Sequence, residues 1–156
     1  MTYDLEPEIR DVLKKIDFVK RYKNLAEKFS NKENKLSNYE NERVIDIFES
    51  LGYQTRYMKK ENFFIVGEVK NKDIYTFRFN ISLKYGVVEL IWSVRHKGVI
   101  KAGDPWDIFA RLLSDDTESI PTIFFHSYEE LKEIMMIAFE MYEDFKRELI
   151  EVYSSE

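Results

Sequence analysis

The residues with the most potential for chemistry lie around a histidine at the end of an apolar run. In the segment IPTIFFHSYEELKE, residues 120–133, His126 is followed by Ser127 and then by Glu129 and Glu130. Ser127 and Glu130 have the spacing of a capping box, in which each side chain accepts a hydrogen bond from a backbone N–H at the start of a helix. Acidic residues in a first helical turn are also favoured by the helix dipole. We therefore predict that His126 is a structural residue at a strand-to-helix junction and not a catalytic base.

The second histidine, His96, lies between an arginine and a lysine in SVRHKG. A catalytic histidine requires a partner that orients the ring and holds its tautomer, and neither histidine has a sequence motif that supplies one. Cysteine is absent from the chain, which excludes thiolate zinc sites and cysteine nucleophiles. The sequence also lacks a glycine-rich phosphate loop and a nucleophile elbow. We expect no catalytic residue, no metal site and no cofactor, and hence a protein that is not an enzyme.

One short motif supports a competing hypothesis of metal-dependent nuclease activity. FIVGEVKNK places Glu68 and Lys70 two residues apart on a predicted strand, as in the Glu-x-Lys half of restriction-endonuclease-like active sites. In that chemistry carboxylates hold a divalent metal ion, and the lysine helps to position the attacking water. The aspartate expected on the preceding strand is missing, since that stretch offers only Glu61 at a turn and the nearest aspartate is Asp46 in a predicted helix. A glutamate and a lysine on the wet face of a strand are also an ordinary solvent pattern.

Four segments in the middle of the chain alternate between apolar and polar residues. This period of two predicts strands over about 53–59, 62–70, 74–84 and 86–97. In the third segment Tyr75, Phe77, Phe79, Ile81 and Leu83 share one face. The connections have hairpin length, so the four strands are expected to form an antiparallel meander with one buried face and one wet face.

Apolar residues at helical spacing predict helices on both sides of this meander. Two helical regions precede it, over about 4–29 and 37–52, and a last helix runs from Tyr128 to about Val152. In GDPWDIFARLL, Asp104 is the expected cap of a short helix and Pro105 its first residue, and a short strand is expected before His126. A chain of 156 residues fits one compact domain. The predicted fold is a single α+β domain over residues 1–156, with a four-stranded antiparallel meander and N-terminal and C-terminal helices on its apolar face.

Charge is distributed unevenly along the chain, although the formal net charge is only −5. Residues 53–101 contain 10 basic and 4 acidic residues, whereas residues 102–156 contain 4 basic and 14 acidic residues. The basic hairpins could contact nucleic acid, but the alternation assigns most of their aromatic rings to the buried face. Overall acidity further opposes binding to a phosphate backbone. We therefore do not expect nucleic acid as a partner.

The acidic last third predicts a docking surface for a basic protein, because complementary charge speeds encounter and selects the partner. The alternative is a solvated helix face with no binding role. Trp106 is an expected aromatic anchor, although a core position suits it equally well. The predicted partner-binding residues flank or belong to the short helix: Asp104, Trp106, Asp107, Asp115, Asp116 and Glu118.

The N-terminal sequence, the apolar runs and the cysteine content predict where in the cell the protein is located. No apolar run approaches the length of a membrane span, and the N-terminal MTYDLEPEIRDVLKK lacks the basic and then apolar pattern of a signal peptide. A chain without cysteine has no disulfides, which is typical of proteins in the reducing cytosol. These features predict a cytoplasmic protein that does not contact a membrane.

The C-terminal third resembles small bacterial immunity proteins of polymorphic toxin systems. The resemblance rests on WDIFARLL, the acidic loop that follows it, IPTIFFHSYEELKEIM and FEMYEDFKREL. It implies a cytosolic α+β protein that binds and neutralises a cognate toxin domain without catalysis. A secretion-chaperone-like binding module, which shares the order of helices and meander, is a further alternative.

Overall fold

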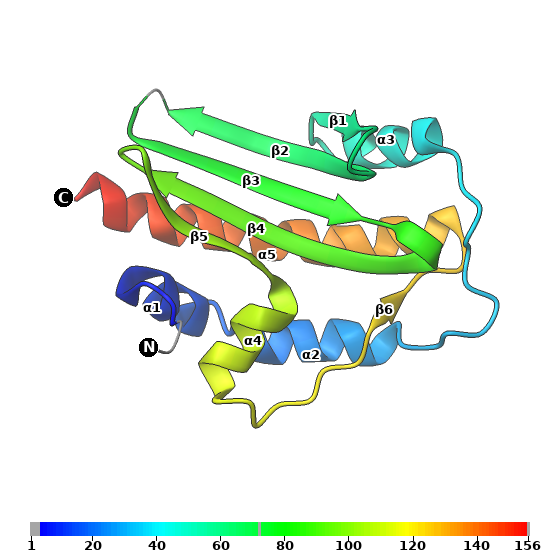
Figure 1. The fold of residues 1–156 in the computed structure, drawn as a ribbon, viewed down its shortest axis with the longest axis horizontal. Coiled ribbons are helices and arrows are strands. Elements are labelled where there is room, and N and C mark those ends of the chain that lie inside the picture. Colours follow the sequence, from blue (N-terminus) through cyan, green and yellow to red (C-terminus); the bar gives the residue numbers. More distant parts are fainter. Residues whose placement is uncertain (1–3, 72, 156) are drawn as a thin grey trace.

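A computed structural model describes residues 4–71 and 73–155 and has the predicted α+β class (Figure 1). In chain order, the helices and strands are α1 (Pro7–Lys15), α2 (Phe18–Lys28), α3 (Asn41–Ser50), β1 (Thr55–Met58), β2 (Phe63–Asn71), β3 (Tyr75–Ser82), β4 (Val87–His96), β5 (Val99–Pro105), α4 (Trp106–Ser114), β6 (Ile123–Phe124) and α5 (Tyr128–Ser154). A short 3₁₀ turn, Lys84–Gly86, joins β3 to β4.

The strands form one antiparallel sheet in the order β1-β2-β3-β4-β5, and β6 pairs with β4. The predicted four-stranded meander is therefore correct in direction and order but wrong in size, because the described sheet has six strands. The sequence of β5, VIKAGDP, lacks alternation, and a register shift interrupts its pairing with β4. Its Gly-Asp-Pro end resembles the start of a helix, so the sequence assigned Asp104 to a helix cap. Asp104 instead lies within β5, and Pro105 is the residue that caps α4.

The apolar face of the sheet is covered by helices. Phe77, Phe79 and Ile81 of β3 are fully buried, as the alternation predicts, and Trp92 of β4 lies beside them. The helix α5 packs along this face, where Phe145 stacks on Trp92 with ring centroids 4.4 Å apart. Figure 1 shows α5 running along the sheet with α1 and α2 beside it. One core cluster extends from Leu5 to Tyr153.

The N-terminal helical region is divided into two helices. Asp17 adopts a left-handed conformation with φ of 59°, so the chain turns between α1 and α2. Both helices then pack against α5. This turn lets a segment predicted as one long helix cover two parts of the core.

The edge of β4 that faces away from β3 is shared by two strands. On this edge β6 pairs with Val87 and Val88, and β5 pairs with the stretch from Ile91 to His96. Glu89 lies between these two ladders and is paired with Ser82 of β3 on the other side. The sheet therefore has a break at this point of the edge, next to the first turn of α4. In the described part of the chain, no helix is long and apolar enough to cross a membrane.

Candidate acidic interaction site

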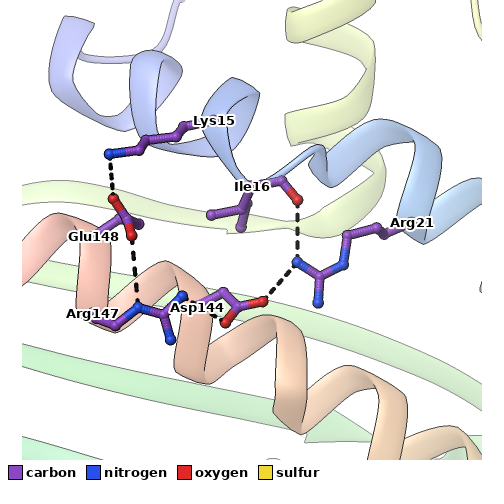
Figure 2. Close-up of polar contacts among 6 residues, drawn as sticks. All are labelled: Lys15, Ile16, Arg21, Asp144, Arg147 and Glu148. Atoms are coloured by element: carbon purple, nitrogen blue, oxygen red, sulfur yellow. Dashed lines mark hydrogen bonds and ion pairs between the residues drawn. The ribbon is translucent and has the colours of Figure 1, made fainter.

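Two carboxylates of α5, Asp144 and Glu148, form ion pairs with the N-terminal helices (Figure 2). Glu148 lies 2.6 Å from the ammonium of Lys15, and Asp144 lies 2.9 Å from the guanidinium of Arg21. Arg147 bridges the same two carboxylates, at 2.9 Å from Asp144 and 3.6 Å from Glu148. These contacts join α5 to α1 and α2, which lie far away in the sequence.

These contacts shift the pKa values of the two carboxylates. Partial burial acts to raise the pKa of Asp144, but hydrogen bonds from Arg21 and Arg147 outweigh it and hold the pKa below its usual range. The hydrogen bond from Lys15 likewise lowers the pKa of Glu148. Much of the negative charge on α5 is therefore neutralised inside the molecule, and this stretch of the helix offers a partner less charge than its sequence indicates.

The predicted acidic loop after α4 is also partly neutralised. Asp116 accepts a hydrogen bond from Arg111 at 3.0 Å, and Glu118 lies 3.0 Å from Lys23 of α2. Asp115 ends α4 in a left-handed conformation and is exposed. It has no ion pair with any residue in the two described ranges. Of the three loop residues, Asp115 offers its charge most directly to a partner.

Trp106 is a core residue, which is the second of the two positions that the sequence left open for it. Its side chain is 1% exposed and packs edge-on against Trp92, with ring centroids 5.0 Å apart. It also stacks on Phe79, at 6.0 Å and an interplanar angle of 28°. The first turn of α4 is bound to the core through this ring. The next residue, Asp107, is consequently held in a fixed place on the surface.

Asp107 lies beside a cleft at the break in the sheet edge. The cleft has a volume of about 220 Å³ and is bounded by α2, β4, the start of α4 and the segment 120–123. Its charged residues are Asp107 and Glu89, both exposed, and its floor includes Tyr22 and Trp106. Within the described chain, neither carboxylate has an ion-pair partner. The structure thus brings together two of the predicted residues, Trp106 and Asp107, with two that were not predicted.

Tyr22 is electrostatically linked to both carboxylates. Burial raises the pKa of its hydroxyl, and the charges of Asp107 and Glu89 raise it further. The hydroxyl, which is protonated at neutral pH even at its ordinary pKa, is thus held still more firmly in the form that donates a hydrogen bond. Sequence reasoning missed Glu89 because a single acid on the wet face of a strand is ordinary, and it missed Tyr22 because nothing in a helical pattern indicates which residue meets a sheet edge.

The two histidines have structural surroundings. Nδ1 of His126 lies 2.6 Å from Glu130, and Nε2 lies 2.7 Å from the carbonyl oxygen of Asn31. The hydrogen bond to Glu130 raises the pKa of His126 above its ordinary value. His96 is buried, and its ring stacks on Tyr153 with centroids 3.8 Å apart. His126 therefore joins the segment before α3 to the start of α5, as a junction residue would.

The nuclease hypothesis is not supported by the surroundings of its two residues. Glu68 is ion-paired with Arg78, and a second guanidinium, from Arg56, lies 3.5 Å away. A carboxylate held between two arginines is a poor metal ligand, because binding a cation would require breaking both contacts. Lys70 is exposed two residues further along β2. Among residues 4–71 and 73–155, no three His, Asp or Glu side chains gather as a metal-binding group.

The chain matches no protein-family model, no curated protein and no solved structure. The site must therefore be judged from its own residues.

Proposed function

We propose that this protein is a non-enzymatic inhibitor that binds a basic partner protein in the cytoplasm, as an immunity protein binds its cognate toxin domain. The observation that carries the proposal is the contrast between two sets of acidic residues. Asp144 and Glu148 of α5 are paired with Arg21 and Lys15, whereas Glu89, Asp107 and Asp115 are exposed near α4 and have no ion pair within the described chain. Unpaired charge on a rigid scaffold is the charge that can attract a partner.

The scaffold around α4 suits such a role. Trp106 anchors the first turn in the core, and Lys23 tethers the loop after the helix through Glu118. A surface held in this way loses little conformational freedom when it binds, which favours affinity. The resemblance of the C-terminal third to immunity proteins supports the same class of function.

A secretion chaperone would use a different surface. Such a protein is expected to form a dimer and to present an apolar groove to its client. Light scattering on the purified protein distinguishes the two functions, since a monomer that binds a basic protein in a salt-dependent way fits the inhibitor. A stable dimer that binds an unfolded apolar segment would favour the chaperone instead.

The direct test uses the product of a neighbouring gene, provided that this product is a secreted protein with a basic C-terminal domain. Binding kinetics are measured at two salt concentrations with the natural chain and with an Asp107→Lys/Asp115→Lys variant. We expect association to slow about tenfold or more in the variant and to lose much of its salt dependence, as for steered encounters. Glu61→Lys, at the turn between β1 and β2, is the control for a change in net charge away from α4, and it makes half the charge change of the double variant.

Two results would contradict the proposal. An association rate in the double variant equal to that of the Glu61→Lys control would remove the surface around α4 from the interface. A neighbouring basic toxin domain that fails to bind the natural chain at all would remove the inhibitor function itself.

A further inference from the structure

The cleft at the break in the sheet edge is lined by polar and charged groups that determine what it can bind. It lies between the stretch of β4 that pairs with β5 and the stretch that pairs with β6. The backbone at Glu89 and Leu90 therefore pairs with β3 on one side and borders the cleft on the other. The segment 120–123 closes the far side. A whole strand of a partner cannot enter a gap of this length, because β5 and β6 already occupy the edge on both sides of it.

The polar groups of the cleft define what it can bind. Glu89 and Asp107 supply carboxylate oxygens, which accept hydrogen bonds and attract a cation. The indole N–H of Trp106 is a donor that has no hydrogen-bond partner, although the ring is 1% exposed. That N–H has almost no accessible surface, so it is closed off from an occupant of the cleft. The exposed carboxylates are therefore the groups that select the occupant, and they favour a cation.

The size of the cleft limits the occupant further. Small-molecule sites usually measure about 300–1,000 Å³, and this cleft measures about 220 Å³. A nucleotide or a cofactor is therefore too large, and its phosphates would meet two carboxylates. One long side chain of a protein is of suitable size.

We infer that this cleft binds a single arginine side chain of the partner protein, with the guanidinium between Glu89 and Asp107. The inference rests on the proposed function, and it names the group that the partner contributes. Arginine suits the cleft better than lysine because its planar head has five N–H donors, which can reach one carboxylate on β4 and one on α4. The same head also packs on aromatic rings, and Tyr22 lines the cleft.

The test uses the two tryptophans of the chain as paired reporters. Trp92 and Trp106 are both buried, and the indole N–H of each lacks a hydrogen-bond partner, but only Trp106 lines the cleft. Each gives its own indole signal in a ¹⁵N-correlation NMR spectrum. The probes are N-acetyl-arginine-N-methylamide and its citrulline counterpart, which has nearly the same shape without the charge. We expect the arginine probe to shift the Trp106 signal in a saturable way and to leave Trp92 unchanged, and we expect the citrulline probe to shift neither.

Conservative variants locate the cation. Glu89→Gln/Asp107→Asn keeps the size of both exposed side chains and should weaken binding of the arginine probe about tenfold or more, because charge-assisted hydrogen bonds are among the strongest in proteins. Glu61→Gln, at the far edge of the sheet, should leave the affinity unchanged.

Each other outcome overturns the inference. A Trp106 signal that does not move, or that moves equally with citrulline, would show that the cleft is not a cation site. An equal response to N-acetyl-lysine-N-methylamide would overturn the assignment to a guanidinium. These failures are separable from failure of the proposed function, because binding of the intact partner to the natural chain is measured without the probes and Asp115 lies outside the cleft.

Discussion

Gly67 is the position at which a single methyl group should have the largest effect on the sheet. It lies in the bulge of β2, between Val66 and Val69, where the register against β3 shifts. Its φ of +56° is in the left-handed region, and its N–H donates to the carbonyl oxygen of Gln54 at 2.9 Å. Its own carbonyl oxygen accepts a hydrogen bond from the hydroxyl of Tyr142 at 2.8 Å. The bulge is therefore held from both sides, by the chain before β1 and by α5.

A β-carbon at this position would meet two rings. It would lie 2.7 Å from Cδ1 of Tyr53 and 3.3 Å from Cε2 of Tyr142. The left-handed conformation costs a residue with a side chain about 1–2 kcal/mol, and overpacking adds about 1–3 kcal/mol. We expect Gly67→Ala to lower the free energy of unfolding by about 2–5 kcal/mol, a large part of the total stability of a typical domain.

The matched control is Gly98→Ala in the turn between β4 and β5. Its φ is +79°, and a β-carbon there has no heavy atom within 4 Å apart from its chain neighbours. Gly98→Ala should therefore lower the free energy of unfolding only by the cost of the left-handed conformation, about 1–2 kcal/mol. Both variants are measured by urea unfolding followed by tryptophan fluorescence. The excess cost of Gly67→Ala should shrink in a Tyr53→Ala background, since that change removes the closest ring.

Equal costs for Gly67→Ala and Gly98→Ala would refute the reasoning, because they would mean that the bulge has room for a methyl group. An excess cost that persists without the ring of Tyr53 would assign it to Tyr142 instead.

Phe145→Ala should cost about 3–5 kcal/mol in urea unfolding, as expected for emptying a fully buried aromatic site; an unchanged midpoint would mean that the ring adds nothing to the core. Ser127→Ala should cost about 1 kcal/mol, because the hydroxyl caps α5 by accepting from the backbone N–H of Glu130 at 3.1 Å; a Ser127→Thr control should recover most of the loss. His126 has a raised pKa in the folded chain, so its contribution to stability is present in full below the unfolded pKa and is lost as the pH rises through the folded pKa. His126→Gln should therefore flatten the pH dependence of the unfolding free energy between these two pKa values. Asp144 has a lowered pKa, so its contribution to stability is present above the unfolded carboxyl pKa and is lost as the pH falls through the folded pKa. Asp144→Asn should therefore have a lower free energy of unfolding than the natural chain at neutral pH and should lose less of it in acid. Parallel pH profiles for the two proteins would contradict the pairing.

Periodicity was sufficient to predict most of the fold. The strict alternation in β3 identified Phe77, Phe79 and Ile81 as buried, because a strand that covers a core on one face must alternate. The start of α5 was predictable as well, since Ser127 caps the helix through local contacts along the chain. In both cases the determining interactions repeat along the chain or join residues close to one another in it.

The strand β5 could not be predicted in the same way. It pairs with β4 through a register shift, and Val99 and Ile100 are 55% and 60% exposed. An edge strand with exposed apolar residues and an irregular ladder has no alternation to detect. Its identity as a strand depends on hydrogen bonds to β4.

The sequence by itself determined the class of fold, the buried face of the central strands and the acidity of the last third, because these follow from local periodicity and composition. Only the tertiary structure decided which acidic groups have no ion pair within the molecule and can therefore pair with a partner. Packing α1 and α2 against α5 places Lys15 and Arg21 on the carboxylates of that helix, whereas no basic residue of the described chain pairs with Glu89 or Asp107. Ion pairing depends on distances between side chains that are far apart in sequence, and these distances exist only after the helices have packed on the sheet.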